Sequence, residues 1–256
     1  MLQVQGLAVR YGTRQVLESV DIAALPAGSL TALLGPNGSG KSTLLKALAG
    51  LQPAQARLLL DGEDVQRWPR VRRGQQLVYM PQALPRAVRL SVFEALLIAA
   101  HTGRSGPSDR ARQAARLLQQ LGIAALAERR LDELSGGQLQ LVGLAQALIR
   151  QPRVLLLDEP LSALDLNHQF HVMQRLRSET QAHGLITLVV LHDLDTALRH
   201  ADQALMLHQG RVLAQGLPAE VIEPATLARA YGVQARIVGG ELGHPHVHID
   251  GLIPPP

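Results

Sequence analysis

The stretch GPNGSGKST, residues 35–43, contains the residues whose types and spacing most directly predict chemistry. Its spacing is G-x-x-x-x-G-K-[ST], and it lies between an apolar run at 30–34 and a helical pattern of leucines that begins at Leu44. In this context the motif binds phosphate, because glycines without a Cβ let backbone N–H groups approach the anion. The start of the helix adds the positive end of its dipole. We expect the phosphates to be held by Gly35, Pro36, Asn37, Gly38, Ser39, Gly40, Lys41, Ser42 and Thr43.

Two side chains of this loop and two acids further along the chain predict a magnesium-dependent reaction. The Lys41 ammonium can reach the β and γ phosphates of a triphosphate, and the Ser42 hydroxyl can ligate Mg²⁺. The run VLLLDE at 154–159 reads as a buried parallel strand that ends in two carboxylates. Asp158 suits the magnesium shell, and Glu159 suits a base that polarises an attacking water. A strand end that faces only solvent would not explain the apolar residues before it.

Three further side chains have both a functional and a structural interpretation. Gln82 follows an apolar strand at 76–80 and could ligate magnesium and orient water, although an isolated Gln is usually a surface residue. His192 ends the apolar strand at 185–191 and could hold the γ phosphate and the water, although a lone His is more often structural. Tyr11 lies in a turn and could stack on an adenine ring or simply line the rim.

The sequence LSGGQ at 134–138 predicts a second helix start that binds an anion. Ser135 is placed as an N-cap, and residues 139–149 continue as a helix. Gly136 and Gly137 expose further N–H donors. The alternative is a helix cap without a ligand.

The remaining pattern predicts an α/β protein with a helical insertion. Helical periodicity dominates 84–133, with a polar loop at 102–108, and a helix is expected at 169–181. The other strands are expected at 2–10, 16–23, 57–60, 204–207 and 211–214, followed by a helical segment at 219–230 and two short strands within 234–249.

Composition excludes several classes of protein. The 256 residues contain no cysteine, which excludes disulfides and thiolate metal sites and fits the cytosol. A formal charge of +4 and 2% aromatic residues do not favour a nucleic-acid partner. We find neither an apolar run near ~18 residues nor the basic and apolar segments of a secretory signal.

The phosphate loop, LSGGQ and the strand ending in Asp158, Glu159 and Pro160 together resemble the nucleotide-binding subunit of ABC transporters over nearly the whole chain. The resemblance implies an α/β P-loop NTPase core with a mixed sheet, an N-terminal antiparallel β subdomain and a helical insertion. It implies one domain over 1–256, with the core at about 1–83 and 151–232, a helical subdomain at about 84–150 and a short C-terminal β tail at 233–256.

The resemblance also implies roles for the residues singled out above. Lys41, Glu159 and His192 would be catalytic, with His192 as the switch histidine and Glu159 as the general base. Ser42, Gln82 and Asp158 would hold Mg²⁺, and Gln82 would couple that site to the membrane subunit. Tyr11 would stack on adenine, and Asp165 would belong to the D-loop. Ser135, Gly136, Gly137 and Gln138 would contact ATP bound to the other subunit.

The cofactors and partners implied are ATP, Mg²⁺, a second copy of this chain in a head-to-tail dimer, and integral membrane permease subunits. A substrate-binding protein would be an indirect partner, and nucleic acid would not be one. The location implied is peripheral, at the cytoplasmic face of the inner membrane.

Three further sequence segments resemble the ATP-binding subunits of importers for iron–siderophore complexes. Relatives of these importers carry haem and cobalamin. The segments that carry this likeness are 146–173, 191–216 and the AYGV at 230–233. Leu139, Leu141 and Leu161 depart from the pattern common among relatives, without touching the assigned chemistry. Rival interpretations are a non-transport ABC ATPase acting on DNA or ribosomes, a regulatory module without turnover, and a small-molecule kinase. His244, His246 and His248 alternate and could bind a metal, a metal complex or a proton, or could simply be solvated.

Overall fold

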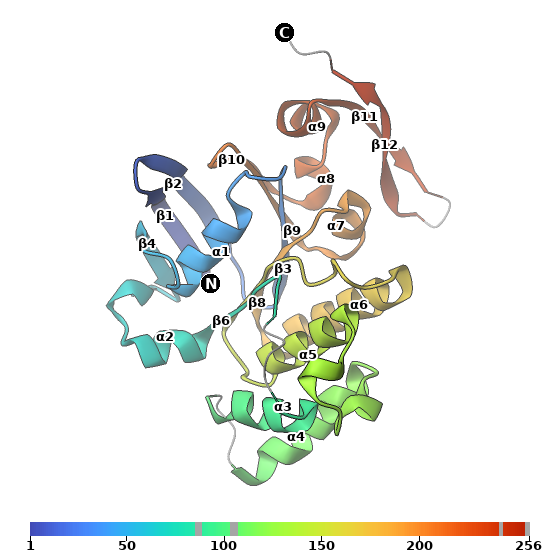
Figure 1. The fold of residues 1–256 in the computed structure, drawn as a ribbon. Helices are drawn as coiled ribbons and strands as arrows, with labels where there is room; N and C mark the ends of the chain where they lie inside the picture. The colour runs from blue at the N-terminus through green and yellow to red at the C-terminus, as the bar shows by residue number, and fades with distance from the viewer. Residues whose placement is uncertain (85–88, 103–106, 241–242, 254–256) are drawn as a thin grey trace.

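A computed structural model describes residues 1–84, 89–102, 107–240 and 243–253 (Figure 1). Its centre is a six-stranded sheet in the order β10-β9-β3-β8-β7-β6. β9 runs parallel to β3, and β3, β8, β7 and β6 are parallel to one another, whereas β10 is antiparallel to β9, so the predicted mixed sheet is confirmed. The strands are β3 (Ser29–Leu34), β6 (Leu77–Met80), β7 (Val154–Leu157), β8 (Ile186–Val190), β9 (Gln203–His208) and β10 (Arg211–Gly216).

A second, antiparallel sheet forms the N-terminal part of the fold, in the order β2-β1-β4-β5. Its buried residues pack with α1 and with one face of the central sheet in a single apolar cluster. This arrangement confirms the expected antiparallel β subdomain. The elements are β1 (Leu2–Tyr11), β2 (Arg14–Leu25), α1 (Lys41–Ala49), β4 (Gln55–Leu60) and β5 (Glu63–Asp64).

The opposite face of the central sheet is covered by helices. Alternate residues of β3 enter different cores: Leu30, Ala32 and Leu34 join the helical cluster, whereas Leu33 joins the cluster around α1. Figure 1 shows α3, α4 and α5 together in a lobe at one end of the molecule, with α6 and α7 between this lobe and the C-terminal elements. These helices are α3 (Val92–His101), α4 (Pro107–Gln120), α5 (Gly136–Leu148), α6 (Leu166–His183) and α7 (Leu194–His200).

The C-terminal part consists of two short helices and a hairpin. The expected helical segment at 219–230 is in fact α8 (Pro218–Val221) and α9 (Pro224–Tyr231), because Pro224 begins a new helix after a break at Ile222 and Glu223. The antiparallel pair β11 (Val233–Gly239) and β12 (Pro245–Leu252) follows and packs on α7. Within the described residues no helix is long and apolar enough to cross a membrane.

Several boundaries differ from the sequence prediction. The strand expected from Gln76 begins at Leu77, because Gln76 ends the helix α2 (Arg70–Gln76), which was not predicted. The expected loop at 102–108 is shorter at its C-terminal end, because α4 begins at Pro107, a residue type that favours the first turn of a helix. Residues 103–106 of that loop lie outside the described residues.

Candidate functional site

The phosphate loop joins β3 to α1, as the strand–loop–helix pattern predicts. Gly35, Gly38 and Gly40 all have positive φ angles, of 139°, 76° and 106°. Gly40 is the N-cap of α1 and has no side chain to occupy the first N–H groups of the helix. The loop therefore presents unfilled backbone donors at a positive helix end, which is the arrangement that binds phosphate.

Lys41 is buried, and its ammonium group turns back onto the loop. Its Nζ donates to the carbonyl oxygens of Gly35 at 2.7 Å and Pro36 at 3.0 Å. Burial lowers the pKa of Lys41, while the nearby charges of Glu159 and Asp158 raise it. Because these carbonyl oxygens belong to the phosphate loop itself, the Lys41 ammonium group needs only a short side-chain movement to reach a phosphate bound there.

Asp158 connects the end of β7 to the start of α1. The Ser42 hydroxyl donates to Oδ1 of Asp158 at 3.0 Å, and the Tyr79 hydroxyl donates to Oδ2 at 2.9 Å. Burial raises the pKa of Tyr79, with the charge of Asp158 as the next cause, so the Tyr79 hydroxyl stays protonated and remains a donor. Ser42 and Asp158 thus bring together hard oxygen donors of the kind that Mg²⁺ prefers, and the donor set fits this ion.

Glu159 is held between two of the other predicted residues. Its Oε2 accepts from Nε2 of Gln82 at 2.6 Å, and its Oε1 lies 2.8 Å from Nε2 of His192. Glu159 also has a φ of 50°, an uncommon backbone conformation for a residue other than glycine. The structure therefore gathers Gln82, Glu159 and His192, which follow β6, β7 and β8, at the carboxyl edge of the sheet, where ligands of open α/β sheets bind.

Gln140 contacts the backbone of Glu159, and the sequence analysis did not identify this residue. This buried residue of α5 donates to the carbonyl oxygen of Glu159 at 2.7 Å and accepts from the N–H of Ala163 at 2.9 Å. A glutamine within the apolar run LQLVGLA at 139–145 was the available signal. Gln140 links the helix that follows LSGGQ to the backbone of the acidic strand end.

The LSGGQ segment starts α5 as predicted, with a full capping box. The Ser135 hydroxyl accepts from the N–H of Gln138, and the Gln138 side chain accepts from the N–H of Ser135. At Gly137 a Cβ atom would lie 2.7 Å from the carbonyl oxygen of Ala163, so this helix start touches the loop before Asp165. In Figure 1, α5 belongs to the lobe with α3 and α4, whereas α1 lies beside the N-terminal strands.

Two predicted residues lie at the exposed rim. Tyr11 ends β1 and leaves 45% of its surface exposed, so its ring is accessible for stacking. Asp165 is the N-cap of α6 and accepts from the N–H of His168 at 2.9 Å. This backbone hydrogen bond is the main reason that the pKa of Asp165 is lowered.

The three alternating histidines do not form a metal cluster. His246 and His248 are exposed on β12, and His244 precedes the strand. Among residues 1–84, 89–102, 107–240 and 243–253, we find no group of three or more His, Cys, Asp or Glu side chains that could hold a metal ion. Their exposure matches the solvated interpretation.

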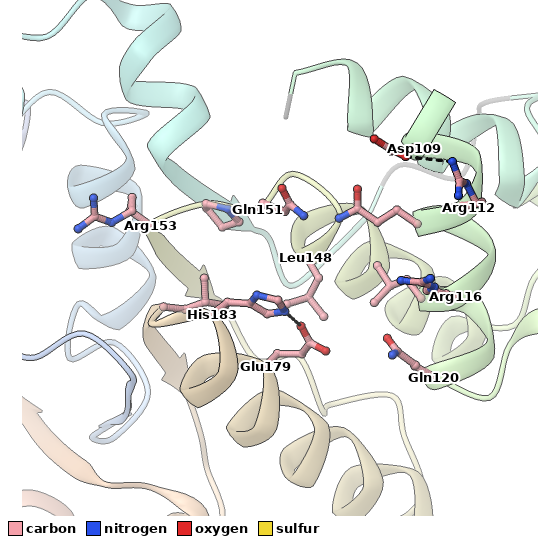
Figure 2. A pocket seen from close by; sticks show the side chains of 13 residues that line it. Asp109, Arg112, Arg116, Gln120, Leu148, Gln151, Arg153, Glu179 and His183 are labelled. Carbon is pink, nitrogen blue, oxygen red and sulfur yellow. Dashed lines mark hydrogen bonds and ion pairs between the residues drawn. The ribbon is translucent and has the colours of Figure 1, made fainter. Parts of the chain in front are cut away.

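A separate polar pocket of about 520 Å³ lies between α4 and α6 (Figure 2). Its wall includes Arg153 and Leu185, which precede β7 and β8, so it lies at the amino ends of these strands. Figure 2 shows Arg112 paired with Asp109 and His183 paired with Glu179. The pocket contains none of the predicted site residues, and we assign it no role.

These features define a nucleoside-triphosphate-binding protein of the phosphate-loop class. Comparisons with known proteins narrow this class. The ABC transporter family model matches residues 20–162. The chain is 37% identical to the hemin import ATP-binding protein HmuV of Bordetella avium, over 93% of this chain and 94% of that protein. It is 35% identical to the achromobactin transport ATP-binding protein CbrD of Dickeya dadantii, over 93% of this chain and 90% of that protein.

Solved structures agree with this result. An ATP-binding subunit of an ABC transporter matches with a TM-score of 0.77 and 27% identity, over 91% of this chain and 94% of that one. CbiO1 of Clostridium perfringens, part of the ABC transporter complex cbiONQ, matches with a TM-score of 0.76 and 26% identity, over 89% of this chain and 92% of that one. The chain belongs to the ABC transporter family. It is an ATPase of that family, in which ATP hydrolysis drives transport.

Proposed function

We propose that this chain is the ATP-hydrolysing subunit of an importer for an iron compound, either a ferric siderophore or hemin. The observation that carries the enzymatic part is the position of Glu159, held by Gln82 and His192 beside the pair of Ser42 and Asp158. The cargo class is supported by the relatives, which are named for hemin import and achromobactin transport. It agrees with the sequence resemblance to siderophore importers and their haem-carrying relatives.

Each residue at the site has a proposed step. Gly35 to Thr43 bind the phosphates of ATP, Lys41 moves from the loop carbonyls to the β and γ phosphates, and Tyr11 stacks on adenine. Ser42, Asp158 and Gln82 would hold Mg²⁺, which neutralises charge on the phosphate oxygens. Glu159 takes a proton from the attacking water while the water oxygen bonds to the γ phosphorus. The bond from the γ phosphorus to the β–γ bridging oxygen breaks, and ADP and phosphate leave. His192 orients the Glu159 carboxylate and the γ phosphate.

The second helix start supports a head-to-tail dimer. Gly136 and Gly137, in the first turn of α5, and the Gly35–Thr43 loop offer N–H groups suited to an anion, whereas the N–H groups of Ser135 and Gln138 are used by the capping box. The two segments belong to different lobes. We propose that each ATP lies between the phosphate loop of one copy and the LSGGQ segment of the other. ATP binding then closes the dimer, and hydrolysis opens it.

A groove beside Gln82 is the proposed docking site for the permease. Its cavity is about 330 Å³, and it is lined by Pro81, Leu84, Ile98, Gln146 and other residues of β6, α3 and α5. Ile98 leaves 56% of its surface exposed, although it is a large apolar residue. Because Pro81 adjoins Gln82, a permease segment in this groove can transmit a movement of Gln82. Docking there would keep the subunit at the cytoplasmic face of the membrane.

The docking proposal is tested with Ile98→Asp. We expect this variant to lose co-purification with the permease and to keep its own phosphate release, because Ile98 is an exposed residue of α3 and is not one of the residues proposed to bind the nucleotide. Val71→Asp is the matched control, since Val71 is an apolar residue on α2 with 72% of its surface exposed. Equal co-purification of both variants would contradict the docking site.

The enzymatic proposal is tested by phosphate release from Glu159→Gln. We expect a fall of about 10²- to 10⁴-fold, which is the usual contribution of a general base, with ATP binding retained. Glu128→Gln is the matched control, because Glu128 is an exposed carboxylate outside the site. Normal turnover by Glu159→Gln would remove Glu159 from the role of base.

A further inference from the structure

The phosphate loop is in direct contact with the C-terminal part of the chain. The backbone N–H of Gly35 donates to the hydroxyl oxygen of Tyr231 at 3.0 Å, across 196 positions of sequence. Tyr231 is the last residue of α9, and Figure 1 shows this helix on the side of the central sheet where β3 leads into α1. None of the roles derived above uses this hydroxyl.

Of the three glycines in the loop, Gly35 has the least room for a Cβ atom. Its φ is 139°, and a Cβ atom would lie 2.0 Å from the carbonyl oxygen of Leu207. Gly35 is buried, so its N–H must be satisfied by the protein. The carbonyl oxygen of the same residue accepts from Lys41. When Lys41 moves to a phosphate, the bond to Tyr231 still fixes the amide end of Gly35.

Tyr231 is itself held rigidly. Leu227 and Ala230 of α9 are buried in the helical core, and Gly232 closes the helix in the left-handed conformation. The N–H of Ile253 donates to the carbonyl of Gly232 at 2.8 Å, which joins the end of β12 to the end of α9. Burial raises the pKa of Tyr231, although its bond from Gly35 opposes the rise, so the hydroxyl stays neutral at physiological pH.

We propose that Tyr231 is a positioning residue for ATP binding, which holds Gly35 so that the phosphate loop is preformed before the nucleotide arrives. The C-terminal segment of α9, β11 and β12 then serves as a rigid support for the loop. Without the hydroxyl, the buried N–H of Gly35 loses its partner, and the loop occupies other conformations. The apparent affinity for ATP is then the intrinsic affinity multiplied by the fraction of molecules whose loop has the binding conformation. The inference rests on the nucleotide site proposed above.

The test compares Tyr231→Phe with the wild type in nucleotide binding and in steady-state phosphate release. We expect the Kd and the KM for ATP to rise about three- to tenfold, as for the loss of one buried hydrogen bond. We expect kcat at saturating ATP to stay within about twofold, because Tyr231 touches no reacting group. A residue with a merely structural role would change the melting temperature without this separation of KM and kcat.

Two controls make the result decisive. Thr226→Val removes another hydroxyl from α9, one that donates to Glu223 at 3.2 Å, and should leave the Kd unchanged. Lys41→Ala should lose ATP binding. If Lys41→Ala fails to bind ATP but Tyr231→Phe binds it like the wild type, the positioning role is overturned alone. If Lys41→Ala binds ATP normally, the proposed nucleotide site is overturned and this inference with it.

Discussion

At the scale of single residues, the chemistry depends on carboxylates that are held from several directions. Glu159 is contacted through its side chain by Gln82 and His192 and through its backbone by Gln140. Asp158 is contacted by Ser42 and Tyr79. Fixed partners reduce the reorganisation needed when charge develops on the transferred phosphate, which is the main source of catalysis in phosphoryl transfer.

Tyr79 provides a prediction at this scale. Tyr79→Phe removes the donor to Oδ2 of Asp158 and keeps the ring, so Asp158 is less firmly oriented toward a metal ion. Loss of such a supporting contact typically weakens metal affinity about 10- to 100-fold. We therefore expect half-maximal phosphate release to need about tenfold or more Mg²⁺, with the maximal rate largely restored at high Mg²⁺.

The measurement is a magnesium titration of phosphate release. Tyr11→Phe is the control, because it also removes a tyrosine hydroxyl but lies at the exposed end of β1. An unchanged magnesium requirement in Tyr79→Phe would show that Asp158 needs no orientation by Tyr79.

At the scale of elements, the sequence predicted the strands and loops that carry the site better than the short helices around them. The strands β3 (Ser29–Leu34) and β7 (Val154–Leu157) are fully buried, so their largely apolar sequences identified them. The helices α2 and α7 have only seven residues each and were not predicted, because so short a segment shows barely two turns of periodicity. The long helix α6 (Leu166–His183) extends beyond both ends of the helix expected at 169–181, because Asp165 caps its first turn and Gly184 ends it in the left-handed conformation.

The supporting contacts were the part of the site that sequence reasoning could not find. Tyr79, Gln140 and Tyr231 reach the site across 79, 19 and 196 positions, respectively. Spacing within one element reports neighbours on that element, whereas these contacts depend on how separate elements pack together. The residues that contact the nucleotide in our proposal were predictable because they belong to local motifs with their own chemistry.

Two glycines of the phosphate loop provide a prediction at the element scale. In Gly35→Ala a new Cβ would lie 2.0 Å from the carbonyl oxygen of Leu207, whereas in Gly38→Ala it would meet no atom within 4 Å. Both changes strain a positive φ, at a cost of about 1–2 kcal/mol for an ordinary left-handed residue. Gly35→Ala should therefore lose more than about 3 kcal/mol of unfolding free energy, and Gly38→Ala clearly less.

Denaturant unfolding without nucleotide measures this difference directly. The absence of nucleotide matters because both glycines are proposed to bind phosphate, and bound ATP would stabilise the variants unequally. Equal destabilisation by the two variants would mean that the close approach of Leu207 does not constrain the loop.

At the scale of the whole molecule, each half of the proposed ATP site comes from a different copy. The phosphate loop lies on the central sheet, and the LSGGQ segment begins α5 in the helical lobe. In a head-to-tail pair, a copy with a damaged phosphate loop still offers an intact LSGGQ segment to its partner. This arrangement predicts that two inactive variants can complement one another.

We expect Lys41→Ala and Ser135→Arg each to be inactive alone and a mixture of the two to recover part of the phosphate release. In the mixed dimer one site combines the intact loop of the Ser135→Arg copy with the intact LSGGQ segment of the Lys41→Ala copy. The other site carries both defects. A mixture that remains as inactive as its components would contradict the shared site.

The central claim is that ATP hydrolysis by this chain drives uptake of an iron compound. The most direct measurement is uptake by cells that lack the chain, complemented with wild type or Lys41→Ala and supplied in parallel with labelled ferric siderophore, hemin and cobalamin. We predict that uptake of ferric siderophore or hemin depends on intact Lys41. Cobalamin uptake that alone depends on Lys41 would contradict the cargo class, and uptake that never depends on Lys41 would contradict the role as an importer subunit.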